Sequence, residues 1–472
     1  MKVMFCYINV LGIPYCDLRA ASLSAVLKAN GHKTSLIDFT FGLSYEKAMA
    51  QLKEFNPDIL CMSARSTEFV PNVKFAEFLR ANNIKIPIFV GGSHPTIDPE
   101  DAISHKCFDG ICIGEGEYAL LELVEKIERN QDYSNVKNFW FNRSNSIIKN
   151  PTRPLIEDID ELPMYDYELF DMKTYMKARN GQFDYIATRG CPFQCTFCIN
   201  PTLQGIYKGS KFVRHFSVDR IIKDLKYLVP KYNIREIIFF DETFNMNIKR
   251  LREFSEKYSK EINIPFECDA RADLCNEEVM QLLKKANCDR INLAIESGDP
   301  EVRNKLLKKN ISDQQIISAF HLAKKYGINT MSLNMIGLPF ETKEQIQKTI
   351  DLNKKTMPDS LQVSIFNPFP GSELYEFCKK NNLIRKKDYS ISYYTGTSLY
   401  NPNITEKEIL EIRKRFAYES YKDRSKLKAY LLYIREALTP YYLKHGSIIP
   451  VWFFNLIYKV FFSSKLFNFM RK

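Results

Sequence analysis

The sequence predicts an α/β protein built from a doubly wound parallel sheet, a partial (β/α)6 barrel and a helical C-terminal region. Three observations lead to this prediction: apolar strand-like runs alternate with helical runs over residues 1–125, the alternation resumes at Asp184, and residues 421–472 are basic and aromatic. Apolar strands separated by helices are typical of parallel sheets that helices cover. We expect four segments: residues 1–140, a linker at 141–180, residues 181–380 and residues 381–472.

Composition limits the class of protein. The chain has 472 residues, more than one hydrophobic core usually supports, and 45% of them are hydrophobic, which excludes a disordered chain. Its 12 cysteines are scattered, and most sit in apolar strand-like runs, so we expect free thiols in a reducing, cytoplasmic compartment. The first residues resemble a strand rather than a signal peptide, and no uninterrupted apolar run is long enough to span a membrane.

The net charge of +11 is concentrated at one end of the chain. Residues 421–472 contain ten Lys and Arg against two acidic residues, a balance of +8, so the other 420 residues carry only +3. A nearly neutral body is weak support for nucleic-acid binding, and we expect no nucleic-acid partner.

The first alternating series predicts a parallel sheet with helices on both faces. Its strands are expected at residues 2–10, 33–39, 58–64, 86–92 and 109–117. Ligands bind such sheets at the carboxyl ends of the strands, which here carry Ser63, Gly91, Gly92, Gly114 and Glu115. Glycines after a strand let the backbone approach a large flat or phosphate-bearing ligand closely, although they also occur where a tight turn alone requires them.

The second series contains six strand-like runs, each of which a helix can follow. The strands are expected at residues 184–188, 235–244, 264–273, 290–298, 328–339 and 360–372. Helices between them begin at Ser217 and at the capping boxes of Ser312 with Gln315 and Thr342 with Gln345. Six units in roughly 190 residues are fewer than the eight of a full barrel, so the sequence predicts an incomplete one.

Polar residues follow the strands of this second series. The carboxyl ends of parallel barrel strands form the face that carries chemistry, and polar groups at the ends of five consecutive strands favour a functional site there. In chain order they are Cys191, Cys195 and Cys198, then Asp241 and Glu242, then Arg271, then Glu296 and Ser297, and finally Gly337 with Glu341.

The three cysteines lie in the stretch TRGCPFQCTFCINP. Soft thiolates select zinc, copper(I) or iron–sulfur clusters. A structural zinc normally takes four protein ligands, and no fourth lies nearby, while a disulfide would leave one cysteine over. Three thiolates on one loop can instead hold three corners of a four-iron four-sulfur cluster and leave the fourth iron open. Phe197, beside the last cysteine, would shield such a cluster from water.

This spacing, with an aromatic residue before the last cysteine, resembles the signature of the radical S-adenosylmethionine enzymes, and the resemblance extends over about residues 180–380. In that family, residues of the FFDETFN type (Asp241, Glu242) help seat the methionyl amino group, and the AIESG segment (Glu296, Ser297) approaches the ribose. NMIGLPFET, with Gly337, resembles the segment beside adenine, and FNPFPGSELYE resembles the sixth strand. We include Arg271 and Phe197 among the expected cofactor-binding residues.

The whole-chain pattern is similar to the subgroup with an N-terminal, Rossmann-like cobalamin-binding domain. VGGSHPTIDPE and GICIGEGEYALLELVE are typical of that domain, which implies a role for the residues at its strand ends in binding cobalamin. One departure is clear. The loop after the first strand, NVLGIPYCDLRAAS, lacks the histidine that better-known cobalamin domains place under cobalt. His94 lies on another loop and is expected to be a loop residue, and Cys16 a small buried thiol.

The resemblance implies an iron–sulfur cluster, S-adenosylmethionine and cobalamin, with reductive cleavage of S-adenosylmethionine and functionalisation of an unactivated carbon, most simply by methyl transfer. A ring closure or rearrangement, as in the magnesium-protoporphyrin ester cyclases, is the alternative within the family. A cobalamin- and cluster-binding sensor without turnover is the alternative outside it. A small-molecule or lipid-like substrate and an electron donor such as flavodoxin or ferredoxin are implied as partners.

The C-terminal region allows two interpretations. Its apolar runs are interrupted by prolines and lysines, which disfavours a membrane-spanning helix. The segment fits either a helical cap packed over the barrel mouth or an interfacial segment at the inner face of the membrane, whose aromatic residues would enter the lipid surface. Those aromatic residues are Trp452, Phe453, Phe454, Phe461, Phe462 and Phe467.

Overall fold

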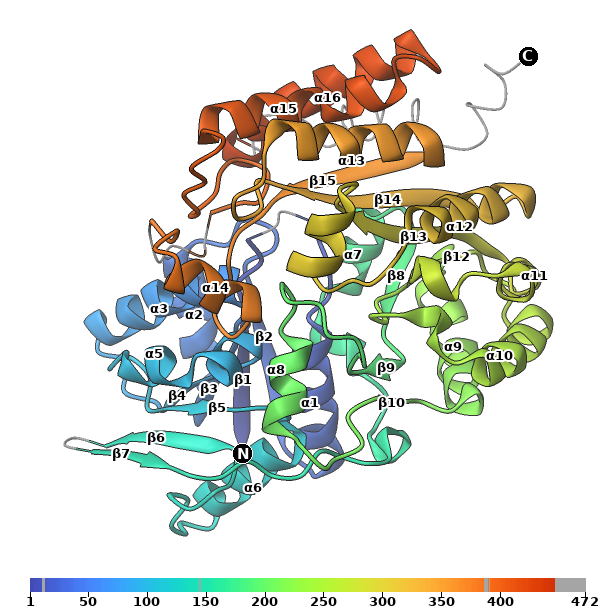
Figure 1. Cartoon of the computed structure of the whole chain (residues 1–472). Coiled ribbons are helices and arrows are strands. Elements are labelled where there is room, and N and C mark those ends of the chain that lie inside the picture. The colour runs from blue at the N-terminus through green and yellow to red at the C-terminus, as the bar shows by residue number, and fades with distance from the viewer. Residues whose placement is uncertain (11–12, 144–145, 386–388, 390, 446–472) are drawn as a thin grey trace.

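The computed structural model describes residues 1–10, 13–143, 146–385, 389 and 391–445. Two sheets dominate it (Figure 1): one near the N-terminus, drawn in blue and cyan, and one in the middle of the chain, drawn from green to orange. The six C-terminal aromatic residues of the interfacial hypothesis lie outside the described residues. In the described part of the chain, no helix is long and apolar enough to span a membrane.

The first sheet has the order β2-β1-β3-β4-β5-β6-β7. Its strands are β1 (Lys2–Tyr7), β2 (Lys33–Asp38), β3 (Ile59–Ser63), β4 (Ile88–Gly91), β5 (Gly110–Cys112), β6 (Phe139–Arg143) and β7 (Ser146–Lys149). The first five are parallel, as predicted. The helices beside them are α1 (Leu18–Ala29), α2 (Tyr45–Phe55), α3 (Ser66–Ala81), α4 (Ser93–Ile97), α5 (Pro99–Ser104) and α6 (Glu117–Glu128).

Helices cover both faces of this sheet. On one face, Val3 and Phe5 of β1 pack with Leu27 of α1 and Leu120 of α6. On the other face, Met4 and its neighbours pack with α2, α3 and α5. Because alternate side chains of a strand point to opposite faces, near-continuous apolar runs are what this arrangement requires. The prediction of a doubly wound sheet is confirmed.

An antiparallel hairpin, β6 and β7, continues the first sheet to Lys149. The first domain was expected to end at residue 140, which lies inside β6, and a linker was expected after it. The hairpin alternates buried Phe139 and Phe141 with more exposed neighbours, a pattern that does predict a half-buried strand. The rest of the expected linker contains η1 (Ile159–Glu161), η2 (Tyr167–Leu169) and α7 (Met172–Ala178), and Tyr167 is buried in the barrel's core.

The second sheet has six parallel strands in the order β15-β14-β13-β12-β11-β8. They are β8 (Gln182–Tyr185), β11 (Glu236–Phe239), β12 (Phe266–Ala270), β13 (Cys288–Glu296), β14 (Asn329–Ile336) and β15 (Ser360–Ile365). The helices between them are α9 (Val218–Tyr232), α10 (Ile248–Glu261), α11 (Glu277–Lys285), α12 (Asp313–Lys325) and α13 (Lys343–Thr356). Ser217 caps α9, and both predicted capping boxes are formed. The incomplete barrel is confirmed.

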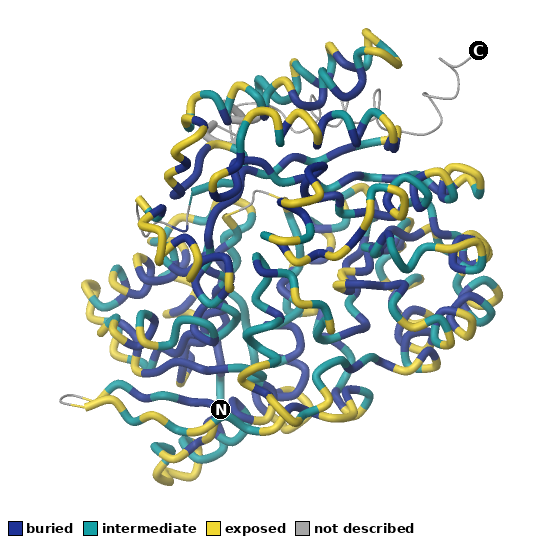
Figure 2. The backbone as a smooth tube through the Cα atoms, in the orientation of Figure 1, coloured by how far each residue is buried: buried dark blue, intermediate teal, exposed yellow. Residues whose placement is uncertain are grey.

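The two faces of the barrel strands differ in polarity. Phe266 and Cys268 of β12 point outward into the core under the helices, where they contact Phe239 and Phe254. Figure 2 shows these strands as mostly buried tubes between more exposed helices. The alternating residues of β12 are polar: Asn292 donates to Glu267 and Asp269, at 2.9 and 2.8 Å. The concave side of the barrel is therefore suited to polar ligands.

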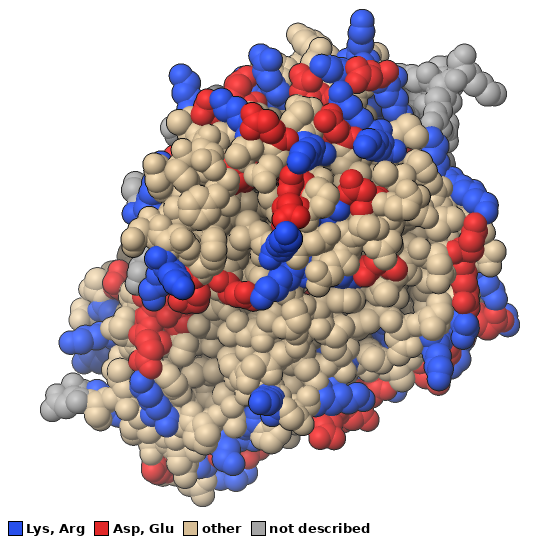
Figure 3. Space-filling view, viewed as in Figure 1, with Lys and Arg blue, Asp and Glu red and all other residues tan. Residues whose placement is uncertain are grey.

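The C-terminal region packs over the last two strands. It contains α14 (Glu373–Lys380), α15 (Glu406–Tyr421) and α16 (Lys426–His445). Ile409 and Phe416 of α15 and Ala429 of α16 share a core with Ile336 of β14 and Ile365 of β15. Lys, Arg, Asp and Glu gather over this end of the molecule, whereas much of the middle of the same face is uncharged (Figure 3).

Candidate functional site

The cysteine loop leaves the barrel after its first strand. β9 (Thr188–Arg189) pairs with β10 (Arg214–His215), and the three cysteines lie between β9 and α8 (Asn200–Ile206). Gly190 begins the loop at φ +84°, and a Cβ there would come within 2.6 Å of the Phe212 carbonyl oxygen. Only glycine combines this conformation with that approach.

The three thiols are partly exposed at the carboxyl-end face of the barrel. Burial raises the pKa of the Cys198 thiol to about 11, although the backbone and side-chain N–H groups of Asn200, both 3.5 Å from its sulfur, act in the opposite direction. Burial also raises the pKa of Cys191. Among the described residues, the one group whose metal-binding atoms all lie within 4.8 Å of one another is His94, Asp98 and Asp101. The sulfurs of Cys191, Cys195 and Cys198 are therefore not all within 4.8 Å of one another.

Thr196 fixes the middle of the loop. Its N–H donates to the Leu307 carbonyl, its hydroxyl donates to the Leu306 carbonyl at 2.7 Å, and its own carbonyl accepts from Leu374 N–H at 2.8 Å. Phe197 packs against the apolar cluster around Leu307 and Leu374. Thr196 was not predicted as part of the site, although its position between Cys195 and Cys198 was an available signal.

Arg271 holds the loop from the end of β12. Its guanidinium lies 3.7 Å from the centre of the Phe193 ring, and it donates to the Lys309 carbonyl at 2.5 Å. Asp273 lies 2.9 Å from the same guanidinium. A cation over an aromatic face is attracted to the ring's quadrupole, so this contact ties the loop to the barrel. The structure thus places Arg271 against the loop, as a polar strand-end residue.

The two acids after β11 occupy different environments. Asp241 is completely buried and accepts from Ala187 N–H at 3.1 Å, and burial raises the pKa of its carboxyl group. Glu242 is exposed at the surface, and its carboxylate accepts from the side chain of Asn200, which also contacts the Cys198 sulfur. Burial of the carboxyl group raises the pKa of Glu242 as well, although the Asn200 hydrogen bond acts in the opposite direction. Of the two, Glu242 is the acid next to the cysteine loop.

Glu296 ends β13 in a strained position. It has φ +62°, and the pairing with β14 is irregular between Ala294 and Glu296. Its carboxylate lies 3.1 Å from the buried ammonium of Lys309, a partner that the sequence analysis did not identify. Ser297 is fully buried, and its carbonyl accepts from Arg303. A non-glycine residue at positive φ is disfavoured, so surrounding contacts such as the one with Lys309 must hold Glu296 in this conformation.

The turn after β14 is organised by a buried acid. Gly337, at φ +75°, and Leu338 donate their N–H groups to one oxygen of Glu341, at 2.7 and 3.1 Å. Burial raises the pKa of Glu341 to about 8, although these two backbone N–H groups act in the opposite direction. The other oxygen has no hydrogen-bond partner among the described residues.

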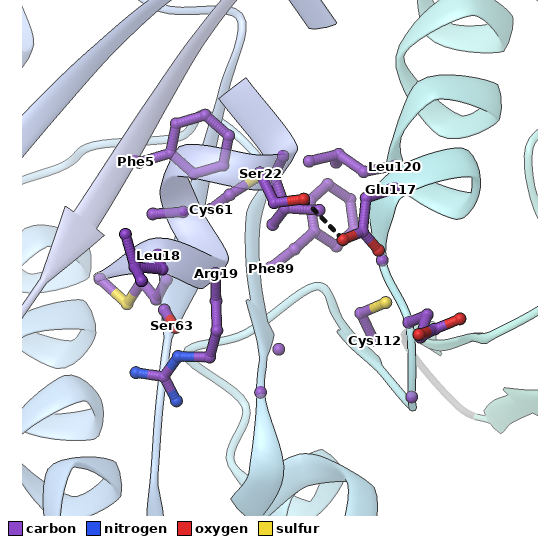
Figure 4. Close-up of a pocket in the computed structure, with 18 of the residues that line it drawn as sticks. Phe5, Leu18, Arg19, Ser22, Cys61, Ser63, Phe89, Cys112, Glu117 and Leu120 are labelled. Carbon is purple, nitrogen blue, oxygen red and sulfur yellow. Dashed lines mark hydrogen bonds between the residues drawn. The ribbon is translucent and has the colours of Figure 1, made fainter. Parts of the chain in front are cut away.

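A second site lies at the carboxyl edge of the first sheet. There a cavity of about 310 Å³ opens between β1, β3, β4, α1 and the turn before α6. All five residues predicted at these strand ends line it: Ser63, Gly91, Gly92, Gly114 and Glu115. Figure 4 shows Phe5, Cys61 and Phe89 at the apolar side and Ser22 hydrogen-bonded to Glu117 across the cavity wall.

At two of these positions, the backbone conformation and the nearby atoms require glycine. Gly92 has φ +107°, and a Cβ there would lie 2.7 Å from the Ala64 carbonyl oxygen. At Gly114, φ +80°, a Cβ would overlap the Tyr207 hydroxyl, which belongs to the chain just after α8. Both interpretations of the glycines therefore apply: tight backbone requirements and a ligand-sized cavity occur at the same positions.

An ionic network joins the two sites. Glu115, at the cavity wall, accepts from Arg189 at 2.9 Å and from Arg214 at 2.9 and 3.0 Å. Glu117 accepts from Arg189 at 2.6 Å. Burial alone would raise the pKa of Glu117, but Arg189 beside it holds that pKa below the usual value. The Glu117 carboxylate is thus ionised, and both Glu115 and Glu117 accept hydrogen bonds from arginines of the barrel.

His94 and Cys16 lie away from the cavity lining. His94 is fully buried, its Nδ1 lies 3.1 Å from the Ser66 hydroxyl and its ring lies 4.0 Å from that of Phe69. Cys16 N–H donates to Asp184, and its sulfur lies 3.8 Å from that of Met172. His94 thus lies in α4 and not in a loop as expected, and Cys16, expected to be buried, is partly exposed.

Comparisons with known proteins identify two domains in the chain. The model of the radical SAM superfamily matches residues 185–352, and that of the B12 binding domain matches residues 6–124. An uncharacterised methyltransferase from Pyrococcus horikoshii is 30% identical over 423 residues, which are 89% of this chain and 90% of that protein. The chain belongs to the cobalamin-dependent radical SAM enzymes.

Other members of this family resemble the chain over most of its length. The cytidylyl-2-hydroxyethylphosphonate methyltransferase of Streptomyces wedmorensis is 22% identical and covers 86% of both chains. The structure of the radical S-adenosylmethionine methyltransferase TsrM from Kitasatospora setae, with tryptophan substrate and a SAM analogue bound, has a TM-score of 0.69 at 17% identity. It covers 82% of this chain and 77% of that chain, and supports the fold.

The residues present fit the three cofactors of a cobalamin-dependent radical SAM enzyme, a four-iron four-sulfur cluster, S-adenosylmethionine and cobalamin. Three free, partly exposed thiols on one loop suit the cluster. The cavity suits part of a large organic cofactor, because its wall combines apolar side chains with the backbone of Gly91, Gly92 and Gly114 and the buried hydroxyl of Ser63.

Proposed function

We propose that this enzyme transfers a methyl group to an unactivated carbon of a small molecule. The observation that carries the proposal is the adjacency of the two sites: Arg189, which directly precedes the cysteine loop, also lines the cavity of the first domain. Methyl transfer requires a methyl donor and a radical generator within reach of one substrate, and this adjacency provides it. The methyltransferase names of the relatives support the same reaction.

The bound cofactors would supply a radical and a transferable methyl group, while the protein binds, orients and excludes water. Cys191, Cys195 and Cys198 would hold three irons of the cluster. Glu242, exposed beside Asn200, is the acid we assign to the methionyl ammonium, and Asp241 supports the strand beneath it through Ala187. A charge-assisted hydrogen bond of this kind contributes about 1.5–3 kcal/mol.

The remaining contacts to S-adenosylmethionine are assigned to the next strand ends. Glu296 and Ser297 are proposed at the ribose, with Glu296 oriented by Lys309. Gly337, whose N–H and φ are fixed by the Glu341 turn, is proposed beside adenine. Arg271 and Phe197 support the loop rather than the nucleoside, because their contacts are made to Phe193 and to the apolar cluster.

Cobalamin is assigned to the first domain. Its nucleotide tail would enter the cavity past Ser63, Gly91 and Gly92, and Gly114 with Glu115 would form the wall toward the barrel. Among the described residues lining this cavity none is a histidine, so we propose that no protein imidazole binds cobalt.

The partners follow from the same chemistry. A one-electron donor such as flavodoxin or ferredoxin would reduce the cluster. Contact with a membrane surface is proposed through α16, where Leu427, Tyr430 and Ile434 are exposed at helical spacing and the exposed Lys426 precedes them. Apolar groups with flanking cations suit an anionic lipid surface and a hydrophobic substrate.

The decisive experiment is anaerobic incubation of the reconstituted enzyme with cobalamin, reductant and S-adenosylmethionine carrying a deuterated methyl group. Formation of 5′-deoxyadenosine tests the radical chemistry, and transfer of the deuterated methyl group to a product tests methylation. A product without that label would favour the alternative of ring closure, for which the similarity to the anaerobic magnesium-protoporphyrin IX monomethyl ester cyclase of Rubrivivax gelatinosus, 24% identical over 371 residues, is the supporting observation. Absence of 5′-deoxyadenosine would favour a non-catalytic sensor.

A further inference from the structure

We propose that Arg189 is a positioning residue that couples occupancy of the first-domain cavity to the geometry of the cysteine loop. The inference rests on the assignment of cobalamin to that cavity. Arg189 is the last residue of β9, and only Gly190 separates it from Cys191. Its guanidinium is nonetheless directed away from the loop, to Glu115 and Glu117 of the first domain.

The contacts of this guanidinium are specific. One terminal nitrogen donates to Glu115 at 2.9 Å, and the other donates to Glu117 at 2.6 Å and lies 3.4 Å from the Ser22 hydroxyl. Ser22 itself donates to Glu117 at 2.7 Å. All four side chains line the cavity, so a ligand that fills the cavity lies against the same groups that orient Arg189.

The chain segment that carries the cysteine loop makes two further contacts with the turn that contains Glu115 and Glu117. Arg214, in the strand that pairs with β9, binds both carboxylate oxygens of Glu115 and the Ile156 carbonyl. Tyr207, after α8, places its hydroxyl where a side chain at Gly114 would be. Residues 189–214 contain all three cysteines, and this segment therefore contacts the Gly114–Glu117 turn at three points.

The charges in this contact are balanced and shielded. Two arginines face two glutamates, and the four side chains are 4–19% exposed. Glu115 is shared between Arg189 and Arg214, so a displacement of Glu115 changes the charge pairing of both arginines. Ion pairs with little solvent are weakly screened and respond to small displacements, which a well-packed interface transmits as discrete rearrangements.

The consequence is thermodynamic coupling between two ligands. Filling the cavity is expected to select one arrangement of Arg189 and thereby one arrangement of the cysteine loop. S-adenosylmethionine would bind at the cluster that the cysteine loop holds. Bound cobalamin should therefore increase the affinity for S-adenosylmethionine, and bound S-adenosylmethionine should increase the affinity for cobalamin by the same factor, because coupling between sites is reciprocal.

The test uses the full chain with its cluster reconstituted and kept oxidised, so that S-adenosylmethionine is bound but not cleaved. Calorimetry measures the Kd of hydroxocobalamin with and without saturating S-adenosylmethionine, and the Kd of S-adenosylmethionine with and without hydroxocobalamin. The ratio of each Kd without the other ligand to the Kd with it should be at least about fivefold in wild type, for both ligands. Arg189→Gln should bring the ratio to within about twofold of one, and Arg189→Lys, which keeps one cation, should restore part of it.

Two further variants separate coupling from folding. Glu117→Gln removes the opposing charge from the other domain and should lose coupling in the same way. Lys28→Gln breaks an ion pair with Asp166, 2.8 Å long, that lies outside the cavity, and should keep the wild-type ratio. The electron paramagnetic resonance g values of the cluster give an independent readout when they are recorded in excess titanium(III) citrate, so that the cluster and cobalamin are both fully reduced. These g values should differ between wild type with and without cobalamin, and should be the same for the two samples of Arg189→Gln.

The outcomes are distinct. A wild-type protein that binds both ligands with a ratio of one, or an Arg189→Gln variant that retains full coupling, overturns the role of Arg189. Loss of coupling in Lys28→Gln as well would also overturn it, because the effect would then belong to the interface in general. A wild-type protein that does not bind hydroxocobalamin overturns the proposed function and this inference together.

Discussion

At the scale of single residues, the site combines groups whose protonation is set by burial. Burial raises the pKa of the Cys198 thiol to about 11, so near neutral pH the metal-free side chain carries its proton. Iron binds the thiolate, and cluster assembly must release that proton. We therefore expect cluster reconstitution to be more complete at pH 8.5 than at pH 6.5.

The cluster itself is tested by replacing its ligands. In the triple variant of Cys191, Cys195 and Cys198 to Ala, the broad visible absorbance of a thiolate-bound iron–sulfur centre should be absent after anaerobic reconstitution. Cys107→Ala, in a buried thiol of the first domain, is the matched control and should retain it. Full iron and sulfide content in the triple variant would contradict the assignment.

Glu341 predicts a pH effect on stability. Its pKa is raised from 4.5 to about 8 in the folded protein, so between these values the folded state holds a proton that the unfolded state has lost. The contribution of this group is therefore full at low pH and falls by about 1.4 kcal/mol per pH unit toward pH 8. Glu341→Gln cannot ionise, and its unfolding midpoint should match wild type near pH 5 and exceed it at pH 8.5. Identical pH profiles for the two proteins would show that Glu341 is ionised when folded.

At the scale of elements, strand ends and turns carry the site. The cysteine loop is not held by its own hydrogen bonds alone. Thr196 ties it to residues after β13, Arg271 ties it to the end of β12, and Asn200 ties it to Glu242 after β11. Three neighbouring strands thereby set the position of one loop, which is what a cluster open to a cofactor requires.

Arg271 offers a test of this support. Arg271→Ala removes the cation over Phe193, a contact of about 0.5–2 kcal/mol, and should speed loss of iron to a chelator without changing the number of irons initially bound. Arg252→Ala, which removes an exposed ion pair with Glu278, is the control and should leave the rate of iron loss unchanged. Equal rates in all three proteins would argue against the contact.

Gly92 tests the first-domain site. Gly92→Ala should lower retention of cobalamin, since its φ of +107° suits glycine and a Cβ would meet the Ala64 carbonyl. Gly42→Ala is the control, because Gly42 also has a positive φ but has open space around it. Both variants should lose roughly 1 kcal/mol or more of stability from backbone strain, and only Gly92→Ala should also lose cofactor on gel filtration. Equal retention would exclude the turn from the cofactor site.

At the scale of the whole molecule, the first domain and the barrel are joined by packing and by buried charge. Ala21 and Val26 of α1 belong to the core of the barrel, while other residues of the same helix pack on the first sheet. The network of Glu115, Glu117, Arg189 and Arg214 lies in the same interface. The relative position of the two cofactor sites is therefore a property of the folded whole.

The Arg214→Ala variant tests how much stability the ion pairs of that interface contribute. Its side chain is 4% exposed, and Arg214→Ala would leave Glu115 with one cation fewer in a dry environment. Removing one partner of a buried pair typically costs 3–5 kcal/mol, so the thermal midpoint should fall by several degrees. Arg129→Ala, which removes an exposed pair with Glu125, should change it by less than about one degree. A small effect at Arg214 would mean that water enters the network.

The sequence by itself determined the two parallel sheets, the three cysteines and the residues at the strand ends. Helical and strand periodicities are local signals, and the predicted caps at Ser217, Ser312 and Thr342 depend on residues three apart. The hairpin after residue 138 was missed, although Phe139 and Phe141 alternate with more exposed residues, because both strands are short and β7, the edge strand, has only two apolar residues.

Only the tertiary structure decided how these residues are used. Asp241 and Glu242 are neighbours in sequence, yet one is sealed beneath a strand and the other is exposed beside Asn200. Glu115 was predicted as a ligand of the cofactor, and the fold pairs it with two arginines 74 and 99 residues away. Burial and long-range charge pairing depend on which surfaces meet, and that depends on the packing of the first domain against the barrel, which no local pattern encodes.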